Sequence, residues 1–111
     1  MNENTKELLK LIEQNPGLPV VPMVDGEIVT DDFGYYLGAF GSASVDEFVI
    51  SRRDEVLFKS DDDVFDTLER CLTDEEYEAL PETELECRTY YDALPWRKAI
   101  IVYVVPAGGT R

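Results

Sequence analysis

Carboxylates are the only plentiful reactive side chains in this sequence, and half of them lie in one stretch. Residues 61–86 hold 12 of the 24 acidic residues and a single base, Arg70. Carboxylates can bind divalent cations, act as proton donors and acceptors, or present negative charge to a basic partner. The acids of this stretch, called here the acidic segment, are Asp61, Asp62, Asp63, Asp66, Glu69, Asp74, Glu75, Glu76, Glu78, Glu82, Glu84 and Glu86.

The spacing of these acids does not fit a calcium loop. An EF-hand loop that began at Asp61 would need glycine at its sixth position and glutamate at its twelfth. Those positions hold Asp66 and Leu72. Three aspartates in a row also suit the start of a helix, where the helix dipole favours negative charge. The sequence therefore predicts no metal site and no cofactor, and leaves open only weak, nonspecific divalent binding.

Catalysis by the common nucleophiles is excluded by composition. The chain has no histidine, so neither a Ser-His-Asp nor a Cys-His nucleophile can be built. No carboxylate pair stands out among the 24 as an acid and base. We predict that the protein is not an enzyme, with a small carboxylate enzyme using a divalent metal as a third hypothesis. Cys71 and Cys87 are predicted to be buried free thiols, with a disulfide or redox pair as the alternative.

The charge is unevenly distributed along the chain. The net charge is −14, with −6 in residues 1–60, −11 in 61–86 and +3 in 87–111. Such a field repels nucleic acid and anionic membranes and attracts basic protein surfaces. The longest apolar run, AIIVYVV at 99–105, is far shorter than the roughly 20 residues of a membrane helix. The N-terminus lacks the apolar core of a signal peptide, so we expect a cytoplasmic protein.

The first half of the chain is typical of a helix followed by strands. Asn4 or Thr5 is predicted to cap a helix that ends near Gln14 and lies on the sheet. Residues 18–24 contain two prolines and indicate an edge strand. Asp25-Gly26 predicts a tight hairpin turn. Further strands are expected at 27–30, at 33–43 with bends at Gly38 and Gly41, at 44–51, and at 55–59 antiparallel to its predecessor after a charged turn at 52–54.

The acidic segment is predicted to form two or three helices with apolar inner faces. Ser60 would cap a helix over 61–72, with Asp61, Asp62 and Asp63 in its first turn. Thr73 with Glu76, and Thr83 with Glu86, are spaced as capping boxes of two more helices. The expected inner faces are Val64, Phe65, Leu68, Cys71 and Leu72 in the first helix, and Cys87, Tyr90, Tyr91 and Leu94 in the last.

Residues 97–105 are apolar without alternation, which is typical of a strand buried on both faces. We place this strand centrally in the sheet. The sequence thus predicts a single α+β domain over residues 1–111. Its elements are a mostly antiparallel sheet, an N-terminal helix, a helical acidic segment and a buried C-terminal strand.

The leading functional hypothesis is an acidic interaction protein that occupies a basic surface on a partner protein. If residues 61–86 were one helix, their 12 acids would be spaced roughly 3.3 Å apart, close to the phosphate spacing of a DNA strand. A nucleic-acid-mimicking inhibitor is therefore one form of the hypothesis, with all 12 acids as its binding residues. The alternative is a structural domain that self-associates through its sheet or the aromatic segment Phe33–Phe40, with the acids serving solubility only. Partner identity and oligomeric state are left open.

The stretches VVPMVDGEIV, FKSDDDVFDTLERCLTDEEYEALPETE and DALPWRKAIIVYV resemble small acidic proteins of Firmicute phages and integrative mobile elements. The likeness covers most of the chain. It implies a bacterial cytoplasm and an accessory role, and it is compatible with DNA-mimic inhibitors. It implies no activity and no functional residues.

Overall fold

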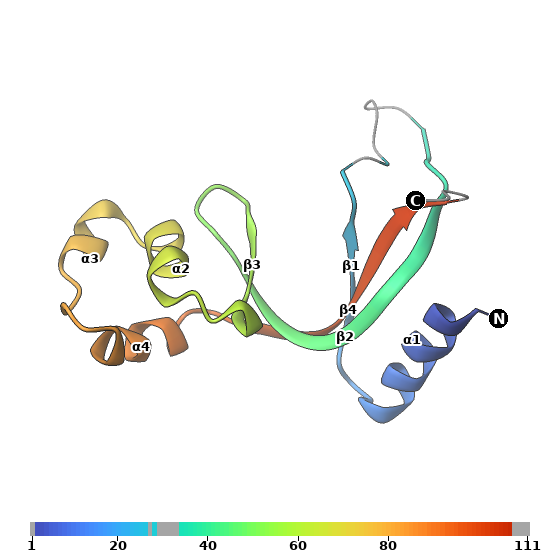
Figure 1. Ribbon diagram of the computed structural model, residues 1–111, viewed down its shortest axis with the longest axis horizontal. Helices are drawn as coiled ribbons and strands as arrows, with labels where there is room; N and C mark the ends of the chain where they lie inside the picture. The colour runs from blue at the N-terminus through green and yellow to red at the C-terminus, as the bar shows by residue number, and fades with distance from the viewer. Residues whose placement is uncertain (1, 27, 29–33, 108–111) are drawn as a thin grey trace. The chain divides into compact units, whose positions relative to one another are not determined.

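The computed structural model describes residues 2–26, 28 and 34–107. Its helices and four-stranded sheet confirm the predicted α+β class (Figure 1). The chain falls into two compact units, residues 1–45 with 99–111 and residues 46–98. Each unit has a buried apolar cluster of its own. Within the described residues, no helix has the length and apolar character needed to cross a membrane.

The sheet has the strand order β1-β4-β2-β3. Its strands are β1 (Val20–Val24), β2 (Gly38–Ile50), β3 (Val56–Phe58) and β4 (Arg97–Pro106). The central position of β4 and the edge position of β1 are confirmed. The sheet is mixed rather than strictly antiparallel, because β2 pairs with β3 antiparallel whereas β1 pairs with β4 in parallel, from Val20 beside Ile100 to Val24 beside Val104. Only a long connection allows parallel pairing, and here most of the chain lies between the two strands.

The first unit, residues 1–45 with 99–111, is built on α1 (Glu3–Gln14). The Asn2 side chain caps this helix by accepting a hydrogen bond from Thr5 N–H at 2.8 Å, so the predicted caps at Asn4 or Thr5 lie inside the helix. Leu8 packs with Ile100 and Val102 of β4. The amphipathic pattern therefore places α1 on the sheet, as predicted.

One continuous strand replaces the two predicted over residues 33–51. A Cβ atom on Gly38 would lie 2.6 Å from Val104 Cγ1, and one on Gly41 would lie 3.2 Å from the Tyr103 carbonyl oxygen. These glycines let β2 approach β4 closely, and both belong to the continuous strand rather than to a break in it. The chain turns after Asp25, where Ile28 N–H donates to Asp25 O at 3.1 Å, and Ile28 belongs to this turn rather than to the returning strand of the predicted hairpin. The predicted returning strand at 27–30, apart from Ile28, and Phe33 lie outside the described residues.

The second unit, residues 46–98, begins with the β2–β3 hairpin. Phe48 pairs with Phe58, and the predicted charged turn is closed by Ser51 N–H donating to Glu55 O at 2.8 Å. The chain then forms a 3-10 turn η1 (Lys59–Asp61) and the helices α2 (Val64–Cys71), α3 (Asp74–Glu78) and α4 (Glu84–Asp92). The helices α2 and α4 pack together (Figure 1).

The helices of this second unit share one core of Val64, Leu68, Cys87 and Tyr91. Both cysteines are free thiols, as predicted, but only Cys87 is fully buried, and Cys71 is half-buried. Two residues expected on the inner faces, Phe65 and Tyr90, are exposed instead.

Candidate partner-binding surface

The structure divides the 12 acids of the acidic segment among three helices and their connections. Eleven are exposed and Asp66 is half-buried. Asp61 ends η1, Asp62 and Asp63 precede α2, Asp66 and Glu69 lie on α2, Asp74, Glu75, Glu76 and Glu78 form α3 with Tyr77, Glu82 precedes α4, and Glu84 and Glu86 open α4.

The start of α2 differs from the prediction. The helix begins at Val64, and Ser60 belongs to the preceding 3-10 turn rather than to a cap. Asp62 has φ 51°, in the left-handed region that aspartate tolerates better than most residues. Asp63 takes the N-cap position without a side-chain capping bond. The three aspartates therefore do not fill the first helical turn.

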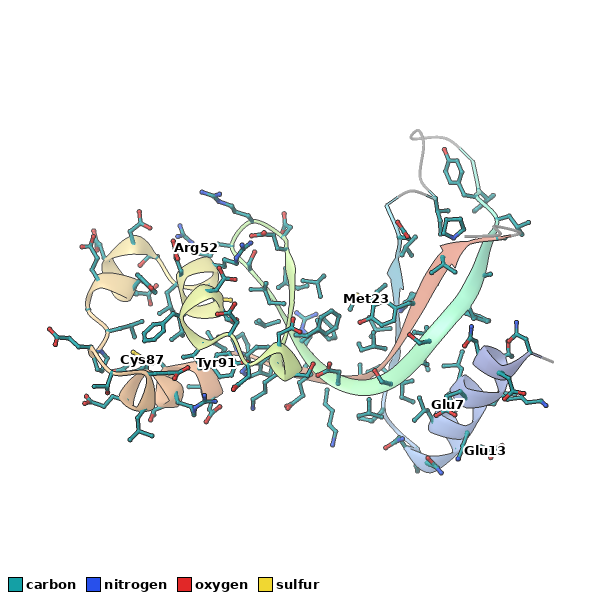
Figure 2. The ribbon with its side chains drawn as sticks, in the orientation of Figure 1. Glu7, Glu13, Met23, Arg52, Cys87 and Tyr91 are labelled. Atoms are coloured by element: carbon teal, nitrogen blue, oxygen red, sulfur yellow. The ribbon has the colours of Figure 1, made fainter. Side chains whose placement is uncertain are left out.

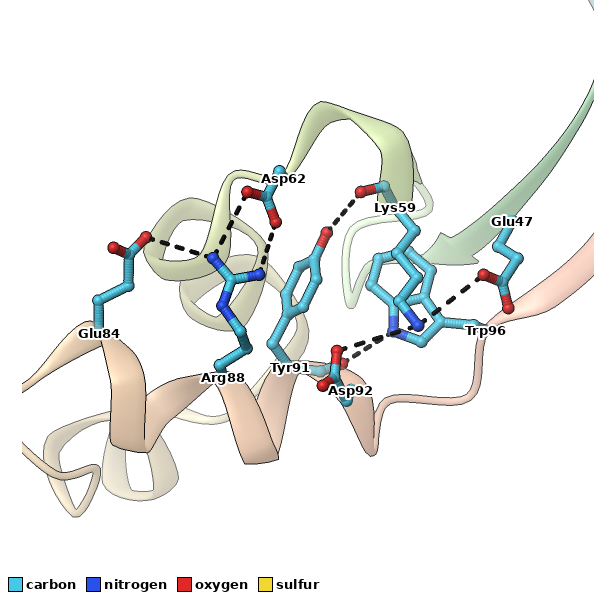
Figure 3. Close-up of polar contacts among 8 residues, drawn as sticks. All are labelled: Glu47, Lys59, Asp62, Glu84, Arg88, Tyr91, Asp92 and Trp96. Carbon is cyan, nitrogen blue, oxygen red and sulfur yellow. Dashed lines mark hydrogen bonds and ion pairs between the residues drawn. The ribbon is translucent and has the colours of Figure 1, made fainter.

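Arg88 of α4 explains the position of Asp62. Its Nη1 donates to Asp62 Oδ1 at 2.7 Å, and its Nη2 lies 3.9 Å from Glu84 Oε1 (Figure 3). The hydrogen bond from Arg88 lowers the pKa of Asp62 and raises that of Arg88. Asp62 and Glu84 are thus partly neutralised within the chain.

Arg70 likewise pairs with two carboxylates, those of Asp66 and Glu55. Its Nε donates to Asp66 Oδ2 at 2.9 Å, and its Nη1 donates to Glu55. The pKa of Arg70 is raised, chiefly by its hydrogen bond to Asp66. Asp66, one of the 12 acids predicted to bind the partner, is therefore held in an ion pair within the chain.

A network that the sequence did not predict joins α4 to the turn before α2 (Figure 3). Tyr91 donates its hydroxyl to the Lys59 carbonyl at 2.9 Å, and Trp96 Nε1 donates to the Tyr91 carbonyl at 2.8 Å. The Lys59 ammonium lies 3.8 Å from Glu47 and 3.9 Å from Asp92. The only sequence signal was the pair of large aromatics, Tyr91 and Trp96, at the end of the last helix. These contacts hold α4 against η1, and both elements contain residues of the acidic segment.

Threonine caps begin both α3 and α4. Thr73 and Glu76 form the predicted capping box, with Thr73 N–H donating to Glu76 Oε1 at 2.9 Å and Glu76 N–H to Thr73 Oγ1 at 3.2 Å. At Thr83, the hydroxyl oxygen accepts from Glu86 N–H at 3.3 Å, which confirms the forward half of the second box. Glu76 therefore has a structural duty that competes with partner binding.

Eight of the 12 acids have no such duty, and four of these lie close together in the sequence. Asp74, Glu75, Glu78 and Glu82, called here the α3 acidic cluster, are exposed and form no ion pair or side-chain hydrogen bond with any described residue. The inward side of this stretch is Tyr77 and Leu80, which pack against the core. The fold therefore displays these four carboxylates to solvent.

The remaining acids do not extend this cluster into one flat face. The helices α2 and α4 bury Leu68 and Cys87 in the same cluster. Helical periodicity then places Glu69 and Glu86 on sides of α2 and α4 that point away from that shared core. Asp61 and Asp63 flank Asp62 before α2, at some distance in sequence from α3. The acids are thus spread over three helices, although Glu69 of α2 and Asp74 of α3 line the same hollow.

A charged hollow of about 520 Å³ lies beside α2 in the second unit, residues 46–98. Arg52 (Figure 2) donates to the Leu72 carbonyl at 3.2 Å and ties the hairpin turn to the end of α2. The hollow is lined by Arg52, Arg53, Glu55, Asp66, Glu69, Arg70 and Asp74. Two of its carboxylates are already paired with Arg70. In the part of the chain that the structure describes, no three acidic or thiol side chains gather into a group that could hold a metal ion.

The capping box of Thr73 and Glu76 predicts that the stability of the fold depends on pH. The hydrogen bond from Thr73 N–H lowers the pKa of Glu76 below its ordinary value of 4.5. A lowered folded-state pKa gives stability that is present above the unfolded value and is lost as pH falls through the folded value. We expect Glu76→Ala to lower the melting temperature at neutral pH, and the difference from wild type to shrink once pH falls below about 4.

The control for this measurement is Glu75→Ala, which removes a neighbouring exposed carboxylate that has no cap bond. Thermal unfolding of the three proteins across this pH range would separate the cap from the general charge. A Glu76→Ala difference that stays constant with pH would contradict the capping role of the carboxylate.

The chain matches no protein-family model, no curated protein and no solved structure. The resemblance to small acidic proteins of phages and mobile elements therefore stays a prediction.

Proposed function

We propose that this protein is a non-enzymatic acidic interaction protein that binds a basic surface of a partner protein through the α3 acidic cluster. The observation that carries the proposal is the set of four exposed carboxylates, Asp74, Glu75, Glu78 and Glu82, that form no ion pair with another described residue, although Asp74 lines the same hollow as Arg52 and Arg53. Carboxylates left unpaired on a folded helix keep their full charge for a partner. The partner surface that we favour is one that binds nucleic acid, because such surfaces present clustered arginine and lysine.

The paired acids narrow the proposal to part of the acidic segment. Asp62, Asp66 and Glu84 already have arginine partners, and Glu76 closes a helix cap. Binding through these residues would require breaking contacts within the chain. We therefore expect them to contribute less to partner binding than the α3 acidic cluster.

The test compares two triple variants that remove the same charge. The first is Glu75→Gln, Glu78→Gln and Glu82→Gln, and the control is Glu3→Gln, Glu7→Gln and Glu13→Gln on α1. The probe is a fluorescein-labelled, arginine-rich DNA-binding peptide, followed by anisotropy. Surface charge pairs contribute about 0.2–1 kcal/mol each, so the first triple should weaken binding by about tenfold. The α1 triple should have a much smaller effect.

Salt dependence and competition complete this test. Affinity for the peptide should fall as salt rises from about 50 to 200 mM, and the protein should displace a DNA duplex from the peptide. Equal effects of the two triples would reject the α3 acidic cluster as the site. Binding that does not respond to salt would reject the proposed function itself.

A second candidate function is self-association through the aromatic segment. Tyr35 and Leu37 are almost fully exposed and Phe40 is half-exposed, and exposed aromatic residues are enriched at protein interfaces. The measurement is the molar mass in solution by light scattering, for wild type and for Tyr35→Ser with Leu37→Ser. A monomer at high concentration would reject this candidate.

A further inference from the structure

Helix α4 carries exposed apolar side chains as well as buried ones. On its inner side, Cys87 and Tyr91 (Figure 2) are buried in the core of the second unit. On the other side, Leu85 is 81% exposed and Tyr90 50% exposed. A helix turns about 100° per residue, which places Leu85, Glu86, Thr89, Tyr90 and Ala93 on one side. All five are exposed, and they are called here the outer face of α4.

The solvent side of the neighbouring helix α2 carries two acids, Asp66 and Glu69, beside one exposed aromatic ring, Phe65. The outer face of α4 carries one charge, Glu86, beside the exposed Leu85 and Tyr90. Leu85 is also the most exposed large apolar side chain in residues 46–98. Single exposed apolar residues are ordinary, but two exposed on one helical face form a surface that a partner can cover.

The charges around this face indicate what covers it. Glu82 and Glu84 precede it and Asp92 borders its end, while the nearby cation Arg88 is held by Asp62. The sequence of residues 46–98 holds 17 acids and 7 bases, so its net charge is −10. A second copy of this chain would bring the same charge to the contact, and like charges across an interface are strongly unfavourable. A cationic segment with an apolar stripe matches both the apolar face and its acidic border.

We propose that the outer face of α4 binds the apolar side of a basic amphipathic helix in the partner. The partner's leucine-type side chains contact Leu85 and Tyr90, and its lysines or arginines contact Glu82 and Glu86. This is the helix-in-groove type of recognition, in which spaced apolar anchors give affinity and the charged rim gives orientation. The inference rests on the proposed function, since it names the kind of basic partner that the acidic segment accepts.

The test uses two labelled peptides of about 18 residues with helical apolar spacing. One has leucine on its apolar side and lysine elsewhere, and the other has every leucine replaced by serine at the same charge. We expect wild type to bind the leucine peptide about tenfold more tightly than the serine peptide. The double variant Leu85→Ser with Tyr90→Ser should lose this difference. The matched control is Leu37→Ser, which removes a leucine of nearly equal exposure, 84%, in the other unit, and it should keep the difference.

The outcomes separate this inference from the proposed function. Equal binding of the two peptides to wild type, or a difference that survives in the double variant, overturns the inference and leaves salt-dependent charge binding intact. Loss of the difference in Leu37→Ser would assign the apolar contact to the aromatic segment and also overturn it. Failure of both lysine peptides to bind, or binding without salt dependence, overturns the proposed function together with the inference. Circular dichroism of each variant establishes that the helices are retained.

Discussion

Replacing Leu68 by alanine is expected to lower the free energy of unfolding by about 2–5 kcal/mol. Leu68 is fully buried and contacts the cluster of Val64, Cys87 and Tyr91 that joins α2 to α4. Truncation removes the transfer free energy of the missing methyl and methylene groups and leaves a cavity. The second unit is small, so few other side chains can move into this cavity. Urea unfolding followed by tryptophan fluorescence measures the change, because Trp96 packs against the same cluster.

The control is Phe65→Ala on the same helix. Phe65 is 39% exposed, so its truncation should cost about 1 kcal/mol, although the side chain is larger than leucine. Equal losses for the two variants would contradict the position of the core. The comparison also tests whether Phe65 lies outside the core, since the sequence predicts both residues on one inner face.

Replacing Ile100 by alanine should cost about as much, again about 2–5 kcal/mol. Ile100 is fully buried, packs with Leu8 of α1, and lies beside Val20 in the parallel ladder. The matched control is Val20→Ala in the neighbouring edge strand. Val20 is 42% exposed, so a loss of about 1 kcal/mol or less is expected. A loss at Val20 as large as that at Ile100 would contradict the register of the two strands.

Together, the Leu68 and Ile100 variants test whether the chain unfolds as one domain. Both β2 and β4 have residues in each of the two compact units, so unfolding of one unit releases strands that the other needs. We expect one transition that both substitutions shift, with far-ultraviolet and tryptophan signals coinciding. Two transitions, each sensitive to one substitution only, would reject the predicted single domain.

Local patterns predicted much of the fold. Prolines at 19 and 22 marked an edge strand, and the unbroken apolar run at 97–105 marked the central strand. The parallel pairing of β1 with β4 was not predictable in this way, since strand direction depends on a contact between residues 80 apart, such as Val20 and Ile100. The exposure of Tyr90 was missed because the buried stripe of α4 runs through Cys87 and Tyr91, and a neighbour of Tyr91 is rotated by about 100°.

In the candidate site, too, contacts between residues close in the sequence were predictable, and contacts between distant residues were not. Composition identified every acid of the acidic segment, and spacing identified the Thr73 capping box. The pairing of Asp66 with Arg70, four residues apart, follows a known helical spacing. The bond from Arg88 to Asp62 joins residues 26 apart, and nothing in the local sequence indicates it. Which carboxylates stay free for a partner is therefore a property of the folded chain.

Pro22 has a consequence for how this molecule behaves in concentrated solution. Asp25 N–H donates to Val104 O, and in a strand successive N–H groups point to alternate sides. The backbone nitrogen of Pro22, three residues earlier, therefore points to the outer edge of β1, where it has no hydrogen to donate. An added strand would find a gap in the middle of its ladder. This discourages edge-to-edge polymerisation of the sheet into fibrils through β1, even near the isoelectric point of about 4.1, where the net charge vanishes.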